Sequence, residues 1–318
     1  MRRLSRHATG VVLVVVSAVA FGGMAIFAKL AYRHGATTPT LLTLRFAIAG
    51  ALMWLIVAAR RGAHPRLSRR TTLGAIGLGV CGYSLQAGGY FAALHHMSAS
   101  MTALLLYTYP ALVFIGAVAL GRERASRVKL GALLLAGTGV ALVVAGAGTG
   151  SVNTTGVLLA GGAAIAYTTY ILVADTLVSG ADPFALTAIV ATGAFCSVGT
   201  FTVVTGQVDL HMDATAWVAL VSLSVVCTVI AITAFFLGLD RVGPSTASIV
   251  STIEPACTVA LAAIFFSERL GAVQLAGGAL VLSAVVVLQL RVGRVTGGAA
   301  PDHAAPAPAA REVPQHAS

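Results

Sequence analysis

The chain alternates between long apolar runs and short polar connections. Each apolar run holds about 20 residues, which at about 1.5 Å per residue in a helix matches the hydrocarbon core of a bilayer. We therefore predict an all-α polytopic membrane protein with ten transmembrane helices. The expected spans are 10–32, 40–59, 72–95, 98–120, 129–147, 154–174, 184–206, 213–239, 244–266 and 271–290.

Composition supports this prediction. Hydrophobic residues make up 58% of the 318 positions and charged residues only 9%, whereas soluble domains carry about 25% charged residues.

The start "MRRLSRH", followed by "VVLVVVSAVA", resembles a signal peptide. The apolar run continues through "FGGMAIFAKLAY", however, so we expect an uncleaved first span.

The basic residues predict an orientation. If the N-terminus is cytoplasmic, sixteen of the twenty Arg and Lys residues fall in cytoplasmic segments, and only Arg33 and Arg269 lie in outer loops. The positive-inside rule then predicts that both termini are cytoplasmic. We expect the protein to lie in the inner membrane. These termini are an N-terminal tail, 1–9, and a tail rich in Ala and Pro, 291–318, that we expect to be disordered. Because the net charge of +10 resides in loops between spans, it does not indicate nucleic-acid binding.

The chain contains an internal repeat. Residues 91–124 align without a gap on residues 236–269 at an offset of 145, matching Pro110 to Pro255 and a Glu-Arg pair in both segments. We therefore predict two five-helix repeats, 10–147 and 154–290. Since five is odd, the second repeat would be inverted in the membrane, an arrangement found in secondary transporters that work by alternating access.

The repeated segments also carry a family resemblance. The segment "YPALVFIGAVALGRERASRVKLGALLLAGTGVALV" and its counterpart "EPACTVALAAIFFSERLGAVQLAGGALVLSAVVVL" resemble the EamA-type proteins of the drug/metabolite transporter superfamily, and "LLTLRFAIAG" fits the family's early pattern. One departure is Ser267, where the family usually has Gly. The resemblance implies a carrier with spans 1–4 and 6–9 around a central cavity and spans 5 and 10 at the periphery. It also implies solute movement, commonly export of amino acids or other metabolites.

Glu254 is the charged residue deepest in a predicted span. Charges at this depth cost roughly 3 kcal/mol or more, so they usually face protein or a water-filled cavity. The adjacent Pro255 frees the carbonyl of Ser251, which needs another partner, and Ser251, Glu254 and Thr258 share one helix face. We predict a substrate or proton site at this kink; the alternative is an ion pair that locks two helices.

Other polar residues within the spans are further candidates. Arg45 is predicted to pair with Glu254, to bind a substrate carboxylate or to act structurally, and Lys29 is expected to reach the headgroups. Tyrosine and glutamine side chains could line a cavity or hold helices together. These are Tyr107 and Tyr109 beside Pro110, Tyr167 and Tyr170 in span 6, and Gln86 in span 3.

Residues at the span ends point to structure rather than chemistry. We expect helix-end or loop salt bridges that shape the turn into the next span at Glu123, Arg124, Glu268 and Arg269. The sequence shows no catalytic residue set, dinucleotide fingerprint or metal-ligand set, and the adjacent His95 and His96 lack a third ligand. We therefore predict no enzyme activity, no cofactor and no metal.

The leading hypothesis is a secondary carrier that exports a small polar metabolite, with proton coupling as an open question. The alternative is an exporter of cationic or amphipathic toxic compounds, with Glu254 as their counter-ion. The expected partners are a small-molecule substrate and the lipid bilayer, and a homodimer through spans 5 and 10 is a further prediction.

Overall fold

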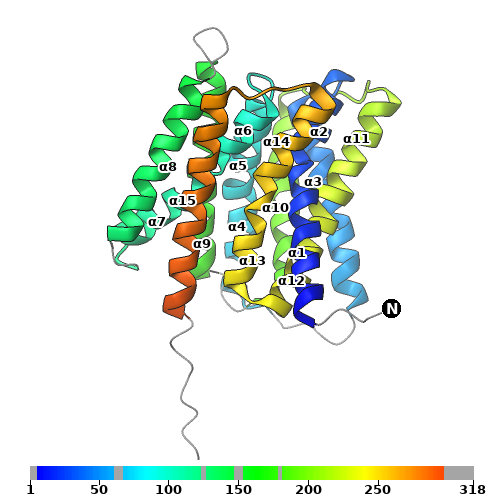
Figure 1. The fold of residues 1–318 in the computed structure, drawn as a ribbon. Coiled ribbons are helices and arrows are strands. Elements are labelled where there is room, and N and C mark those ends of the chain that lie inside the picture. The colour runs from blue at the N-terminus through cyan, green and yellow to red at the C-terminus, as the bar shows by residue number, and fades with distance from the viewer. Residues whose placement is uncertain (1–5, 61–66, 123–126, 147–152, 178–180, 297–318) are drawn as a thin grey trace, which may run out of the picture.

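The computed structural model describes residues 6–60, 67–122, 127–146, 153–177 and 181–296, and this part of the chain forms a bundle of helices (Figure 1). The first half contains α1 (Arg6–Gly22), α2 (Met24–Arg33), α3 (Thr38–Ala59), α4 (Arg69–Gly77), η1 (Leu78–Tyr83), α5 (Ser84–Ala93), α6 (Ala99–Leu106), α7 (Tyr109–Ala119) and α8 (Arg127–Ala145). The second half contains α9 (Thr154–Leu177), α10 (Pro183–Val204), α11 (Ala214–Ser224), η2 (Val225–Ile230), α12 (Ala231–Val242), α13 (Pro244–Ser251), α14 (Ile253–Phe266) and α15 (Ala272–Thr296).

Helical structure covers each of the ten predicted ranges, although α15 continues past the expected end at residue 290. Within the described residues, seven helical segments are long and apolar enough to cross a membrane. The α4–η1–α5 segment is not among them, and α8 and α15 contribute shorter apolar stretches, Leu130–Ala145 and Ala272–Val287. The chain is thus all-helical with several membrane-spanning helices, and the count of ten crossings stays a prediction.

Local sequence explains where several helices begin. Side-chain oxygens of Ser98, Asp182 and Asp213 accept hydrogen bonds from backbone N–H groups in the first turns of α6, α10 and α11. Such N-caps satisfy donors that the helix itself leaves unpaired. Pro183 follows one cap directly, where a missing N–H costs nothing.

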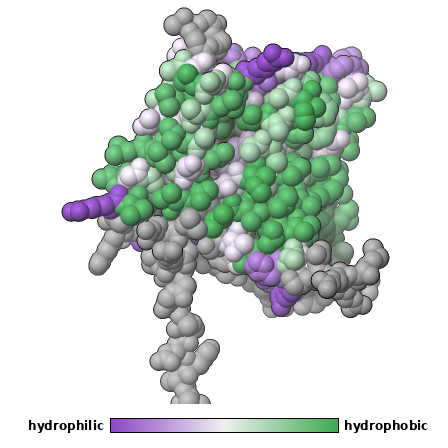
Figure 2. Space-filling view, viewed as in Figure 1, coloured by the Kyte–Doolittle hydropathy of each residue, from purple (hydrophilic) through white to green (hydrophobic). Residues whose placement is uncertain are grey.

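The outer surface is apolar over the middle of the bundle and polar at its ends (Figure 2). Large apolar side chains such as Leu158, Val204 and Ile264 are 70%, 79% and 73% exposed. A soluble protein rarely exposes so much contiguous apolar surface. The distribution is typical of a protein surrounded by lipid.

Helices far apart in sequence pack in pairs: α8 with α15, α3 with α10, α1 with α12, and α5 with α9. The α8–α15 pair approaches closely at Gly139 and Gly277, where a Cβ on either residue would lie 2.6 Å from the carbonyl oxygen of the other. Small residues of this kind let helices in a membrane come into backbone contact.

Five helical segments are interrupted. The breaks at Tyr107–Thr108 and at Thr252 lie next to Pro110 and Pro255, where the sequence predicts kinks. A break at Gly23 separates α1 from α2, and π-helical turns form η1 and η2. The sequence predicts none of these three features. Such π-turns bend a helix and leave local carbonyls for other partners.

Candidate functional site

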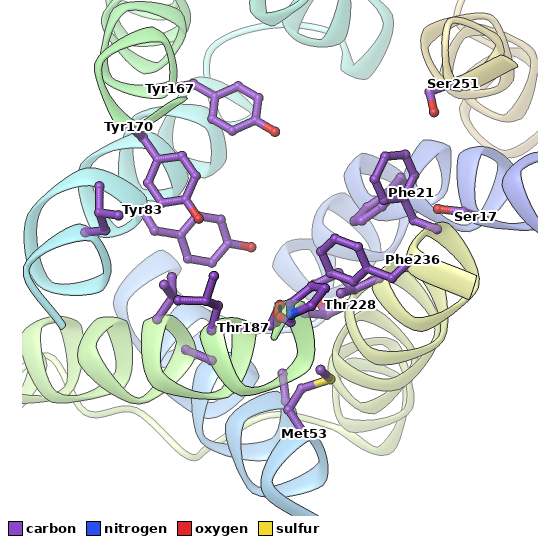
Figure 3. A pocket seen from close by; sticks show the side chains of 18 of the residues that line it. Ser17, Phe21, Met53, Tyr83, Tyr167, Tyr170, Thr187, Thr228, Phe236 and Ser251 are labelled. Carbon is purple, nitrogen blue, oxygen red and sulfur yellow. Dashed lines mark hydrogen bonds between the residues drawn. The ribbon is translucent and has the colours of Figure 1, made fainter. Parts of the chain in front are cut away.

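A cavity of about 470 Å³ lies inside the bundle (Figure 3). The lining residues on α9 and α10, and most of those on α3, lie in the half of each helix nearer the end of the bundle at which α1 begins, whereas those on α1 lie in its last third. The lining side chains are Ser17, Ala18, Phe21, Phe46, Ala49, Met53, Leu78, Tyr83, Tyr107, Tyr109, Tyr167, Tyr170, Pro183, Leu186, Thr187, Val190, Ala191, Thr228, Ile232, Phe235, Phe236, Ser251 and Glu254. The volume is that of an ordinary small-molecule site, about 300–1,000 Å³.

Tyrosine rings form one wall of this cavity. Five of the seven tyrosines in the chain line it, and successive rings are in contact. Ring centroids are 5.8 Å apart for Tyr107 and Tyr109, 4.5 Å for Tyr109 and Tyr167, 6.1 Å for Tyr167 and Tyr170, and 6.2 Å for Tyr170 and Tyr83. In Figure 3, Tyr83, Tyr167 and Tyr170 lie side by side across the cavity from Ser17, Phe21 and Ser251. Tyr107, Tyr109, Tyr167 and Tyr170 therefore belong to one site.

Glu254 lines the same cavity at the start of α14. No ion pair to its carboxylate is found in the described part of the chain. The Tyr107 side chain lies within hydrogen-bonding reach of this carboxylate. The site thus holds one carboxylate, and no basic side chain is present among the described residues that line it.

The kink beside Glu254 has a specific partner. The Tyr107 hydroxyl donates a hydrogen bond to the Ser251 carbonyl at 3.4 Å. Ser251 is the residue whose carbonyl Pro255 leaves without a helical N–H donor. The sequence predicts that this carbonyl needs a partner, and the structure supplies it from the corresponding break in the other half of the chain.

Arg45 lies behind the cavity wall rather than in the cavity. It is 1% exposed, and its Nε and NH2 groups donate to Thr228 Oγ1 at 3.1 Å and to the Tyr83 hydroxyl at 3.3 Å. Its guanidinium also lies 5.0 Å from the centroid of the Phe91 ring. Of the roles that the sequence leaves open for Arg45, pairing with Glu254 is absent from the described contacts, and Arg45 instead holds two residues that line the cavity.

Two other candidates also lie outside the lining. Thr258 donates to the Gly22 carbonyl at 2.9 Å and so joins α14 to α1. Gln86 is buried on α5 but is not a lining residue. Conversely, the polar lining residues Ser17, Thr187 and Thr228 are missing from the sequence-based candidates. A single hydroxyl in an apolar span gives no pattern that would have identified them.

Glu268 takes part in a helix-end salt bridge, and its partner, Lys29, lies far away in the sequence. Its carboxylate accepts hydrogen bonds from the backbone N–H groups of Ala99 and Ser100 and from the Ser100 hydroxyl, at 2.9–3.1 Å. It also pairs with Lys29 Nζ at 3.3 Å. Lys29 therefore does not reach the headgroups as expected, and its side chain is only 18% exposed. The equivalent residues Glu123 and Arg124 lie outside the described residues.

The pKa of Glu268 reflects these contacts. Burial alone raises the pKa of a carboxyl group, but the hydrogen bonds from Ala99 and Ser100 and the charge of Lys29 outweigh it, so the pKa of Glu268 is lowered. Its carboxylate also sits at the N-terminus of α6, where a negative charge is favourable.

Further contacts join the helix ends on the side opposite the N-terminus. The ring of Tyr32 stacks on His95 with centroids 4.0 Å apart, and the Tyr32 hydroxyl donates to the Phe91 carbonyl. Arg33 lies 4.4 Å from the centroid of the Phe266 ring. Together with the contacts of Glu268, they join the ends of α2, α5, α6 and α14.

Comparison with known proteins identifies the family. The family model for the EamA-like transporter family matches this chain twice, over residues 8–145 and 154–290. The chain belongs to the EamA-like transporter family. An uncharacterized transporter of Bacillus subtilis (strain 168), YcbK, is 27% identical over 283 residues, covering 86% of this chain and 91% of YcbK. The protein is therefore a membrane protein of a transporter family.

A solved structure described only as the crystal structure of a protein has the same fold. Its TM-score is 0.62 at 20% sequence identity, and the match covers 90% of this chain and 98% of the other. Because the identity is low, this similarity concerns the fold alone.

Proposed function

We propose that this EamA-family protein is a secondary active transporter that exports a small polar metabolite, such as an amino acid or a related compound, across the inner membrane. The observation that carries the proposal is the solute-sized cavity with Glu254 at the break between α13 and α14. Interrupted helices that face a cavity are the usual construction of a transporter's binding site.

The proposal includes ten spans in two inverted repeats, numbered in the order of the expected ranges. The observed packing supports this symmetry, because exchanging each span with the one five positions away reproduces the most extensive helix pairs. Span 1 packs on span 8 as α1 on α12, and span 6 packs on span 3 as α9 on α5. Spans 2 and 7, and spans 5 and 10, pack on each other as α3 with α10 and α8 with α15. The breaks at Tyr107–Thr108 and Thr252, and the turns η1 and η2, also fall in corresponding spans.

We further propose that these two repeats alternate between two shapes. The state described here has its cavity toward the end that carries the N-terminus, while contacts such as Glu268–Lys29 close the other end. In the proposed orientation the N-terminus is cytoplasmic, so this state would load solute from the cytoplasm.

Export of cationic or amphipathic compounds is a second candidate function. Five tyrosine rings and one carboxylate line the cavity, and aromatic faces attract cations by about 0.5–2 kcal/mol each. A flat aromatic cation would use Glu254 as its counter-ion and the rings as stacking surfaces.

One experiment tests the transport proposal and separates its two forms. The protein and Glu254→Gln are expressed in a host that lacks its own exporters, and secreted metabolites and tolerance to toxic cations are compared. We expect the wild type to enrich a small polar metabolite in the medium and Glu254→Gln to lose this effect. Enhanced tolerance to toxic cations without metabolite export would favour the second candidate, and equal profiles for both proteins would contradict a role for Glu254.

Proton coupling through Glu254 is a testable part of this proposal. Transport of the exported solute into proteoliposomes is measured across an imposed pH gradient. A coupled carrier responds to the gradient, and Glu254→Gln, which cannot ionise, would not. No dependence on the gradient in the wild type would exclude proton coupling.

A further inference from the structure

The hydroxyl of Ser17 is buried and has no hydrogen-bond partner in the described structure. The residue is 1% exposed and lines the cavity from α1, and Figure 3 shows its oxygen directed toward the cavity. Hydroxyls within helices usually bond to the carbonyl four residues earlier. Ser224 and Ser251 do so here, at 2.8 and 2.9 Å, whereas Ser17 does not.

An unsatisfied buried hydroxyl is uncommon and costs free energy, so it needs an explanation. Thr233 Oγ1, on α12, is the other such atom among the described side chains, and Thr233 does not line the cavity. Ser17 therefore combines two properties, since it lacks a protein partner and it faces the space where a solute would bind.

Two further acceptors lie on the helices that pack against α1. The Ser251 hydroxyl gives its proton to Ala247, so its lone pairs stay available, while the Ser251 carbonyl already accepts from Tyr107. Glu254 contributes a carboxylate one turn further along. Both α13 and α14 contact α1. This contact is tight, because a Cβ on Gly22 would lie 2.9 Å from the Glu254 carbonyl oxygen.

We propose that Ser17, Ser251 and Glu254 form a subsite for a primary ammonium group, with Ser17 as a specificity-determining residue. A primary ammonium group has three N–H donors. The carboxylate neutralises its charge and accepts one N–H, and the two hydroxyl oxygens accept the others. The oxygen of Ser17 thus accepts a hydrogen bond when a solute is bound. This inference rests on the proposed function, since it assigns a substrate class to the same cavity.

The subsite distinguishes primary amines from other cations. A trimethylammonium group carries the same charge but no N–H donor, so it interacts with Glu254 and the tyrosine rings and not with the hydroxyls. Loss of Ser17 should therefore weaken binding of a primary amine and leave binding of its trimethylated analogue unchanged.

The test uses two probes and matched variants. The probes are 2-phenylethylamine and its N,N,N-trimethyl analogue, and binding to the purified full-length protein is followed through ligand-induced thermal stabilisation. Ser17→Ala removes the cavity-facing orphan hydroxyl. Thr233→Val removes the orphan hydroxyl that lies outside the cavity and serves as the control. Ser17→Cys, which keeps the volume but accepts hydrogen bonds poorly, is a second variant should Ser17→Ala fold poorly.

We expect Ser17→Ala and Ser17→Cys to bind the primary amine about tenfold more weakly, because a hydrogen bond to a charged group is lost. Binding of the trimethyl analogue should not change, and Thr233→Val should match the wild type with both probes. Equal weakening for the two probes, or unchanged binding of the primary amine, would overturn the proposal.

Failure of this inference can be told apart from failure of the proposed function. If the wild type binds neither probe, the ammonium subsite is wrong, while the secretion profile still decides whether the protein transports a solute. If binding depends on Ser17 but nothing is exported, the subsite stands and the proposed transport does not.

Discussion

Two carboxylates lie at opposite ends of α14, and their surroundings differ in hydrogen bonds, ion pairing and contact with the cavity. Glu268, just beyond its end, has three hydrogen-bond donors and one ammonium group around it. Glu254, at its start, faces a cavity and forms no ion pair with the described residues. A charge whose interactions are all made within the protein stabilises the fold, whereas one left open toward a cavity is available to a ligand. We therefore propose that Glu268 has a structural role and that Glu254 has the functional one.

The largest expected effect is on stability, and it separates the two carboxylates. Glu268→Gln leaves Lys29 partly buried without its ion-pair partner, and breaking such a pair costs about 3–5 kcal/mol when fully buried. We expect a loss of about 3 kcal/mol for Glu268→Gln and less than about 1 kcal/mol for Glu254→Gln. Thermal unfolding of both variants in detergent measures this difference. Equal losses would contradict the division of roles.

The pH dependence of unfolding tests the same contacts of Glu268. Its pKa in the folded state is lowered, so its stabilising contribution is present above the pKa of the unfolded chain, about 4.3, and is lost as the pH falls through the folded value. The wild type should therefore lose more stability than Glu268→Gln between about pH 5 and pH 3. Parallel curves for the two proteins would show that Glu268 does not gain its stability from these contacts.

A smaller effect is expected at the kink beside Glu254. Tyr107→Phe removes the hydrogen bond to the Ser251 carbonyl that Pro255 frees, at a cost of about 1 kcal/mol. Tyr109→Phe is the matched control, since no hydrogen bond from its hydroxyl is found among the described residues. We expect the free energy of unfolding to fall more for Tyr107→Phe than for Tyr109→Phe. An equal or greater loss for Tyr109→Phe would contradict the role of the Tyr107 hydrogen bond.

The smallest effect concerns the residue before Glu268. Ser267 has φ of 52°, and it is the one residue other than glycine with a positive φ in the described chain. The left-handed conformation costs about 1–2 kcal/mol for residues with a Cβ, and glycine avoids most of this cost. Ser267→Gly should therefore stabilise the protein by about 0.5–1 kcal/mol in the same unfolding assay. A destabilised Ser267→Gly would mean that Ser267 makes an interaction of its own.

The positions of helices could be predicted from the sequence because apolar runs fix them. The kinks at Pro110 and Pro255 and the need for a new partner at the Ser251 carbonyl followed from proline chemistry alone. The identity of that partner, Tyr107, could not be predicted, since it depends on how two distant helices pack.

The predictions for charged residues were less accurate, because their partners also depend on how distant helices pack. Lys29 and Glu268 are 239 positions apart, and nothing local in the sequence indicates that they meet. Ser17 was missed because its distinguishing property is a hydroxyl without a hydrogen-bond partner. No sequence pattern indicates that a hydroxyl lacks a partner. The predicted homodimer through spans 5 and 10 stays a prediction.

We propose that Glu254, and not Glu268, binds the solute. The most direct measurement is the transport rate of the exported solute in proteoliposomes for the wild type, Glu254→Gln and Glu268→Gln, each normalised to the amount of folded protein. We expect a transport rate at least about tenfold lower for Glu254→Gln, since a charge-assisted contact with the solute is lost. For folded Glu268→Gln we expect a rate within about threefold of the wild type. A wild-type rate for Glu254→Gln would contradict the account.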